Sequence, residues 1–131
     1  MDTEFEKIIK QLVSKTKKGE VLWNKSSTPN QYTLSLNTGK LTTHLYNAKD
    51  NMIPMSSIKM VECVVENLKG DVVLRANATV ESEDGVILCS LYDAAFRAYT
   101  GKDEVIAGIM KQLESSEPIG NEDGNEEELP F

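Results

Sequence analysis

Hydrophobic positions recur with a helical period over about residues 3–18 and again over about residues 82–114, and at every second position in much of the chain between them. Near the start, five apolar residues predict one face of a helix running from about Thr3 to Lys18: Phe5, Ile8, Ile9, Leu12 and Val13. Thr3 and Glu6 have the spacing of a capping box. Gly19 is suited to a left-handed end of the helix.

After Gly19 the apolar period changes to two, which is typical of strands. The stretch "EVLWNK" predicts a short strand with Val21 and Trp23 on one face. The stretch "QYTLSLNTGKLTTHLY" predicts a hairpin whose turn lies at "NTGK". If Asn37 pairs with Lys40, the apolar positions of both strands share a face, and Gln31, Thr33, Ser35, Thr42, His44 and Tyr46 take the other.

The region from about residue 47 to 80 contains a loop and a second hairpin. "NAKDNMIPMSS" is expected to be a loop that holds Met52, Ile53 and Met55 against the sheet. "IKMVECVVENLKGDVVLRANATVE" also fits a helix in places, but its β-branched residues and the turn-like "NLKG" favour two more strands.

Two helices are expected to follow the strands. Ser82 is a good N-cap for a helix that carries Leu88, Leu91, Ala95 and Tyr99 on one side and ends at Thr100 and Gly101. A final short helix, from about Asp103 to Glu114, has an apolar side of Val105, Ile106, Ile109, Met110 and Leu113. The fold class is therefore α+β: an antiparallel meander of about five strands, with an N-terminal helix and a C-terminal helical pair packed on one face. An OB-fold also has five strands, but the leading helix argues against it.

Composition and charge divide the 131 residues unevenly. All 14 Lys and Arg and 15 of the 21 Asp and Glu lie before Ser115, which leaves a net charge of −1 on that part. The last 17 residues hold six acids, no base and no apolar periodicity. We therefore expect a compact domain over residues 1–114 and a flexible acidic tail over residues 115–131. No apolar stretch is long enough to span a membrane and no signal peptide is recognisable, which predicts a cytoplasmic location.

Candidate catalytic chemistry is sparse. His44 is the single histidine and falls on the polar face of the first hairpin. Cys63 and Cys89 have no metal-binding spacing and are expected to be small buried hydrophobes and not a disulfide. "NTGKLTT" lacks the first glycine of a phosphate-binding loop, and "ESEDG" lacks the spacing of a calcium loop. We expect no enzyme activity, no cofactor and no metal.

The most specific pattern is the ending "NEEELPF". Phe131 offers a ring for an apolar pocket, and a carboxylate beside that ring would suit a cation at the pocket rim. Pro130 restricts the backbone and biases Leu129 towards an extended conformation, so docking costs less entropy. Glu126, Glu127 and Glu128 would accelerate encounter with a basic surface. This pattern predicts a protein-docking segment, whereas the simplest alternative is a solubilising tail.

The same seven residues resemble the C-terminal tip of bacterial single-stranded DNA-binding proteins, which ends in acids, a hydrophobic residue, Pro and Phe. In that family the tip docks onto replication, recombination and repair proteins, so the resemblance implies such partners here. The family tip more often carries Asp than Glu, and the resemblance does not extend to the rest of the chain. The body is only faintly similar to small bacterial and phage proteins of unknown function, through an amphipathic helix leading into "KKGEVLW".

A second candidate surface lies on the predicted sheet. Single-strand binders combine basic side chains with aromatic rings, and the following residues could gather on or around one sheet surface: Lys25, Lys40, His44, Tyr46, Lys49 and Arg75. A net charge of −1 on the body and 6% aromatic residues favour an ordinary solvated face instead.

Three functions remain open from the sequence. The first is a non-enzymatic adaptor or competitor that binds bacterial DNA-metabolism proteins through its tip. The second is a noncanonical single-stranded DNA-binding protein that uses its sheet face. The third is a structural or inhibitory oligomer with a solubilising tail.

Overall fold

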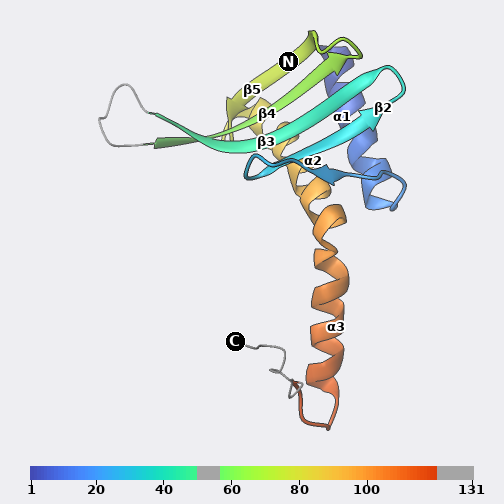
Figure 1. Ribbon diagram of the computed structural model, residues 1–131. Helices are drawn as coiled ribbons and strands as arrows, with labels where there is room; N and C mark the ends of the chain where they lie inside the picture. The colour runs from blue at the N-terminus through green and yellow to red at the C-terminus, as the bar shows by residue number, and fades with distance from the viewer. Residues whose placement is uncertain (50–56, 121–131) are drawn as a thin grey trace, which may run out of the picture. The chain divides into compact units, whose positions relative to one another are not determined.

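The computed structural model describes residues 1–49 and 57–120, and its chain divides into two compact units, Met1–Thr100 and Gly101–Phe131. The first unit contains helices α1 (Thr3–Lys17) and α2 (Glu83–Thr100) and an antiparallel sheet (Figure 1). The second contains helix α3 (Lys102–Glu114). An α+β fold with a leading helix and two helices after the sheet is confirmed.

The N-cap of helix α1 lies one residue earlier than expected. The Asp2 carboxylate accepts the Glu4 backbone N–H at 3.0 Å, so Asp2 is the cap and the predicted Thr3–Glu6 capping box is wrong. A carboxylate caps as well as a hydroxyl and also complements the positive end of the helix dipole. Of the predicted apolar face, Phe5 and Ile9 are buried.

The sheet follows the chain in the order β1-β2-β3-β4-β5, with each strand antiparallel to the next. The strands are β1 (Asn24–Lys25), β2 (Gln31–Leu36), β3 (Gly39–Lys49), β4 (Ser57–Asn67) and β5 (Val72–Thr79). The predicted five-strand meander is thus confirmed. The first strand is shorter than "EVLWNK" suggested, because only Asn24 and Lys25 pair with β2 while Trp23 turns into the core beside α1.

The turn of the first hairpin lies one residue earlier in the chain than expected, which shifts the pairing of its two strands by two residues. Leu36 pairs with Gly39, so Asn37 and Thr38 form the turn and the predicted Asn37–Lys40 pair is absent. A displacement of two residues leaves every side chain on the same face, so the predicted division into apolar and polar faces is confirmed. β3 then continues to Lys49 through residues 47–49, which were predicted to be loop. Met52, Ile53 and Met55 lie outside the described residues.

The core lies between one sheet face and the two helices of the first unit (Figure 1). Tyr32, Leu41, Val61 and Cys63 contribute from the strands, and Leu88 and Leu91 contribute from α2. The N-terminus of α2 is capped as predicted, because the Ser82 Oγ accepts the Gly85 N–H at 3.0 Å. The opposite sheet face, which we call the outer face, carries the polar side chains.

The boundary between the two units coincides with Gly101, whose φ of 68° is the left-handed conformation that glycine adopts without steric cost. Helix α3 has the predicted position and length, but none of its residues is buried. Its five predicted apolar residues are each about half exposed. Among the described helices, none combines the length and apolar character needed to cross a membrane.

Candidate functional site

The predicted docking residues Glu126, Glu127, Glu128, Leu129, Pro130 and Phe131 lie outside the described part of the chain. Their role stays a prediction. All six residues of the second candidate surface, on the sheet, lie within the described residues, and the strand register determines which side of the sheet each one faces.

The six candidate nucleic-acid residues do not share one face. Side chains alternate along a strand, and directly paired residues project to the same side. On β3, Lys40, His44 and Tyr46 therefore lie on the outer face, and Arg75 joins them because it pairs with Val64, which pairs with Thr42. Lys25 pairs with the buried Tyr32 and so belongs to the helix-facing side.

Lys49 also departs from the expected surface. It is six residues from the buried Thr43 on the same strand, so alternation places it on the helix-facing side of the hairpin, opposite Ser57. The sequence assigned the polar face of the first hairpin correctly. It could not assign Lys25 and Lys49, because their side depends on the pairing of β1 and on how far β3 extends.

Each of the two cations on the outer face lies close to a carboxylate of β4. The Arg75 Nη1 is 3.5 Å from the Glu62 Oε2, and the Lys40 Nζ is 3.8 Å from the Glu66 Oε1. The Glu62 side chain is only 17% exposed, so this carboxylate is held among its neighbours. The four charges cancel locally, and a phosphate backbone would have to compete with them for each cation. This arrangement favours the interpretation of the outer face as an ordinary solvated surface over that of a nucleic-acid-binding surface.

The aromatic part of the outer face is also occupied by protein contacts. The His44 and Tyr46 rings stack with centroids 5.0 Å apart and planes inclined by 26°. The Asn77 Nδ2 donates a hydrogen bond to the Tyr46 Oη at 2.7 Å. Tyr46 is thus fixed by one neighbour on its own strand and one on β5, which is adjacent to β4 in the sheet. A base could stack there only by displacing His44 or using the other side of the ring.

An aromatic cluster on the helix-facing side was not recognised from the sequence. Tyr32 lies within 5.6–6.4 Å, centroid to centroid, of three rings on α2: Tyr92, Phe96 and Tyr99. The Lys25 Nζ lies 5.4 Å from the centre of the Tyr32 ring, a cation–π distance. The spacing of the α2 rings, i, i+4 and i+7, was the available signal, since it places all three on one side of a helix.

Burial governs the ionisation of this cluster. Burial raises the pKa of Tyr32, and the neighbouring Tyr99 raises it further by a smaller amount. Burial also raises the pKa of Tyr92, and the neighbouring Tyr32 adds a smaller increase. These phenols therefore stay neutral over a wider pH range than a free tyrosine. The cluster is a packed wall between β2 and α2 that carries no charged group poised for acid–base chemistry at neutral pH.

The two thiols are buried to different degrees. Cys63 is fully buried. Its burial, together with a smaller effect of the Glu62 charge, raises the pKa of the Cys63 thiol to about 12. Cys89 is partly exposed, and burial with Asp93 raises its pKa as well. Both are free thiols. A raised pKa is the opposite of what a nucleophilic cysteine needs, and the prediction of small hydrophobes holds fully for Cys63.

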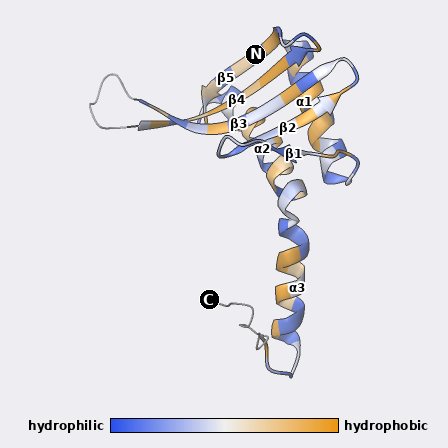
Figure 2. Ribbon diagram, in the orientation of Figure 1, coloured by the Kyte–Doolittle hydropathy of each residue, from blue (hydrophilic) through white to orange (hydrophobic). Residues whose placement is uncertain are grey.

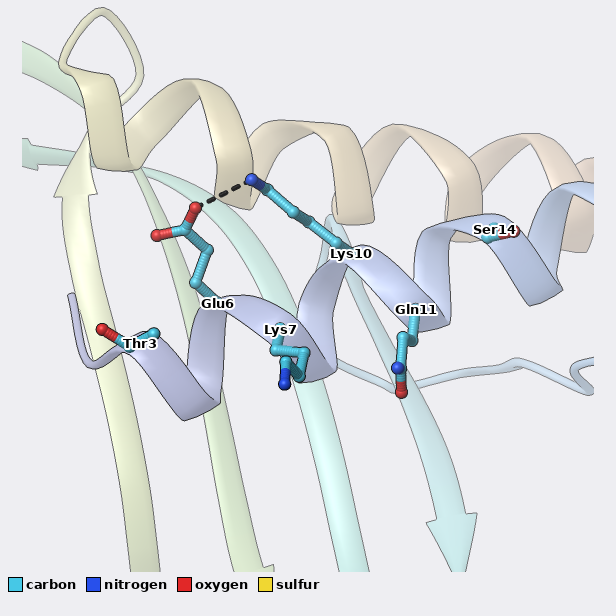
Figure 3. A pocket seen from close by; sticks show the side chains of 6 residues that line it. All are labelled: Thr3, Glu6, Lys7, Lys10, Gln11 and Ser14. Atoms are coloured by element: carbon cyan, nitrogen blue, oxygen red, sulfur yellow. Dashed lines mark ion pairs between the residues drawn. The ribbon is translucent and has the colours of Figure 1, made fainter.

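A hollow of about 410 Å³ lies along the exposed side of α1 (Figure 3). All of its lining comes from that one helix: Thr3, Glu6, Lys7, Lys10, Gln11 and Ser14. The Lys10 Nζ and Glu6 Oε2 form an ion pair of 2.8 Å across one turn. Because successive turns of a single helix provide every side chain, the hollow resembles an ordinary helix surface more than a ligand site, which is usually closed by several elements.

Within residues 1–49 and 57–120, no three His, Cys, Asp or Glu side chains form a group able to hold a metal ion. No family model, curated protein or solved structure matches this chain.

Proposed function

We propose that this chain is a non-enzymatic, cytoplasmic adaptor or competitor that binds bacterial DNA replication, recombination or repair proteins through residues 126–131. The observation that carries the proposal is the order of residues in this segment: three glutamates followed directly by Leu129, Pro130 and Phe131. Solubility would be served by the acids alone, and an apolar cluster at their end adds surface that a partner can bury.

The segment combines two separable interactions. Leu129 and Phe131 supply apolar area and an aromatic anchor of the kind that dominates binding energy at interfaces. Glu126, Glu127 and Glu128 attract a basic surface at long range, which increases the rate of association more than the affinity. The partner is therefore expected to have an apolar pocket with a cationic rim, which is the pocket implied by the resemblance to single-strand-binder tips.

The outer face supports placing recognition in this segment and not in the sheet. Its two cations are close to Glu62 and Glu66, and its Tyr46 ring is stacked on His44. A groove for single-stranded DNA needs unbalanced positive charge and accessible rings. The outer face offers neither in a form that favours binding.

Competition binding with purified components tests the proposal. A fluorescent single-strand-binder tip peptide is bound to a purified helicase or primase that recognises such tips, and the full chain is added as competitor. We expect the full chain to displace the peptide, and Phe131→Ala to weaken displacement by about tenfold or more, as for a hot-spot aromatic. Ile119→Ala is the matched control, because Ile119 is an exposed apolar residue, 56% accessible, outside the motif.

The contribution of the three glutamates can be measured separately, through the rate of association. Replacing Glu126, Glu127 and Glu128 by Gln is expected to slow association at low salt and to have little effect at high salt, where the attraction is screened. Equal displacement by the full chain and Phe131→Ala, or no displacement by the full chain, would refute tip docking.

The DNA-binding alternative is tested on the outer face itself. NMR signals of His44 and Tyr46 are followed during titration with a single-stranded oligonucleotide at low salt. We expect no saturable shift. A saturable shift that salt abolishes, and that Glu62→Gln with Glu66→Gln strengthens, would establish the sheet as a DNA surface and contradict our interpretation of it.

A further inference from the structure

Strand β5 forms a long border of the sheet. It spans eight residues, Val72–Thr79, and β4 is its only neighbouring strand among residues 1–49 and 57–120. The opposite border is β1, which is two residues long. Figure 2 shows β1 and β5 at these two borders. A very short edge strand protects a sheet against further pairing, whereas a long one presents a row of unpaired N–H and C=O groups. The β5 border is therefore available to another strand.

The pairing with β4 identifies which backbone groups of β5 point outwards. The Val80 N–H donates to the Lys59 C=O at 3.2 Å, so Lys59 and Val80 form a hydrogen-bonded pair. Hydrogen-bonded and non-hydrogen-bonded pairs alternate along an antiparallel ladder. Counting back from Val80, Arg75 and Asn77 belong to non-hydrogen-bonded pairs with β4. Their backbone N–H and C=O groups therefore point away from β4, towards the border.

Two features limit the accessible part of this border to residues 74–78, which we call the open edge. At one end, a bulge leaves Val73 without a partner on β4. At the other end, the Thr79 C=O accepts the Ser82 N–H at 3.1 Å and the Ser82 Oγ–H at 2.8 Å. The residue at the centre of the open edge is Ala76.

The polar side chains of the open edge do not cover its backbone. The Arg75 Nη1 lies 3.5 Å from the Glu62 Oε2, and the Asn77 Nδ2 donates to the Tyr46 Oη. Both contacts reach back over the sheet, to β4 and β3. Charged side chains and prolines protect many natural edge strands. β5 has no proline, and its single charged residue is held towards β4.

A second copy of β5 is complementary to the open edge. Two antiparallel copies related by a two-fold axis at Ala76 overlap over the whole of residues 74–78. This register sets Arg75 of one copy opposite Asn77 of the other, and Leu74 opposite Ala78. A longer side chain then meets a shorter one on both faces of the sheet, and no like charges are opposite each other. The outward N–H and C=O groups of Arg75 and Asn77 satisfy one another.

Other registers fit less well. Because paired residues must share a face, the register can change only in steps of two residues. A step in one direction sets Arg75 opposite Arg75 of the second copy, which places like charges together. A step in the other direction sets Arg75 opposite Thr79, whose C=O is already bonded to Ser82. The free backbone groups and the side chains thus indicate the same axis, at Ala76.

We propose that the open edge is a self-association site, on which the same stretch of a second copy pairs antiparallel about a two-fold axis at Ala76. The sheet then continues from one copy into the other. An extended segment of another protein would form similar backbone bonds, whereas a second copy also matches longer with shorter side chains along residues 74–78. The single positive charge of each stretch keeps its Glu62 partner in the dimer.

The size of the contact sets its expected strength. One pair of five-residue stretches buries less than the roughly 800 Å² per partner of a standard stable interface. We therefore expect a weak, rapidly exchanging dimer that is populated at high protein concentration. The dimer does not involve residues 126–131, so Phe131→Ala leaves it unchanged, and a failure of tip docking would not affect it.

Sedimentation of the full chain over about a hundredfold range of concentration tests the proposal, since mass action makes a weak dimer concentration-dependent. The unaltered chain is expected to shift from monomer to dimer. Arg75→Pro removes an outward N–H but no hydrogen bond to β4, which edge strands tolerate, and is expected to remain monomeric. Arg75→Ala is the matched control, because it loses the same guanidinium and keeps the N–H. Its dimerisation constant should stay within about threefold of that of the unaltered chain. Circular dichroism confirms that each variant keeps its fold.

Disulfide cross-linking tests the register. The background is Cys89→Ser, which removes the partly exposed native thiol. Arg75→Cys and Asn77→Cys chains are oxidised separately and as a mixture. Opposite residues of a hydrogen-bonded pair lie about 5.5 Å apart, within disulfide range, whereas residues two positions out of register lie beyond it. The mixture is therefore expected to cross-link about tenfold faster than either variant alone.

Three outcomes would overturn the proposal. The first is a chain that stays monomeric over the whole range, whether its border is left open or is taken by a strand of another protein. The second is equal dimerisation of Arg75→Pro and Arg75→Ala, which would place the contact elsewhere. The third is faster cross-linking of Arg75→Cys alone than of the mixture, which would place the two-fold axis at Arg75.

Discussion

The Trp23 Nε1 donates a hydrogen bond to the Thr16 Oγ1 at 3.1 Å, and both side chains are buried. This contact joins the last turn of α1 to the residue that precedes β1. A buried indole N–H needs an acceptor, and a threonine near the end of an amphipathic helix provides it where an aliphatic residue would not.

We predict that Thr16→Val destabilises the protein by about 1–3 kcal/mol, because it leaves the indole N–H buried without a partner. Chemical denaturation followed by Trp23 fluorescence measures the change. Thr16→Ser keeps the hydroxyl and should lose less stability than Thr16→Val. The opposite order would mean that packing of the Thr16 methyl group matters more than the hydrogen bond.

Thr43 is a second buried threonine, and it differs from Thr16 in the hydrogen bonding of its hydroxyl group. It is fully buried on the helix-facing side of β3, and its Oγ1 has no hydrogen-bond partner among the described residues. Thr43→Val replaces the hydroxyl by a methyl group of similar size and is expected to raise the free energy of unfolding by about 1 kcal/mol or more. Thr43→Ser keeps the hydroxyl, loses the methyl group and should destabilise. A decrease in the denaturation midpoint for Thr43→Val would contradict this reasoning.

Gly39 is required by the close approach of two strands. A Cβ built there would lie 1.9 Å from the Glu66 backbone oxygen, and that oxygen cannot move without disturbing β4. We expect Gly39→Ala to cost about 1–3 kcal/mol or more, as for overpacking of a well-packed interior. Thermal denaturation of the chain checks the value.

Gly108 is the matched control for Gly39. A Cβ there meets nothing within 4 Å, and the residue lies within α3. Gly108→Ala is expected to stabilise that helix by about 0.5–1 kcal/mol through backbone entropy, and so to raise its helicity. If both substitutions had the same effect, the steric reason given for Gly39 would be wrong.

Cys63 should make stability depend on alkaline pH. Its folded-state pKa is raised from 9.0 to about 12, so the folded chain retains a proton that the unfolded chain releases in this window. The contribution of the neutral thiol is complete below pH 9 and is lost as pH rises towards 12. We expect the stability advantage of the unaltered chain over Cys63→Ala to shrink across this range. Urea denaturation at several pH values measures it.

Thiol labelling gives an independent check on the same residue. The partly exposed Cys89 is expected to react with a thiol reagent in the folded state, whereas Cys63 reacts only after unfolding. Rapid labelling of Cys63 under native conditions would show that its burial is transient.

Trp23 shows which structural features could be predicted from the sequence and which could not. Its alternation with Val21 correctly placed it in the core, yet the strand it was assigned to is reduced to Asn24 and Lys25. Apolar periodicity reports which side of an element is buried, whereas strand length depends on whether a neighbour is there to pair with it. For the same reason β3 was predicted too short at its far end.

In the candidate site on the sheet, the face on which a residue lies could likewise be predicted from the sequence, whereas its cross-strand neighbours could not. Lys40, His44, Tyr46 and Arg75 could be placed on one surface from alternation and hairpin pairing. The pairing of Lys40 and Arg75 with Glu66 and Glu62 depends on which residues face each other across strands. A shift of two residues in register changes these neighbours while leaving the apolar pattern intact.

The sequence by itself determined the order and type of the elements, many of the core residues and the acidic-Leu-Pro-Phe segment, because each is encoded by local period, turn residues or composition. The tertiary structure decided which cations are neutralised and where Lys25 and Lys49 project. These depend on contacts between residues far apart in the chain, and no local pattern specifies them.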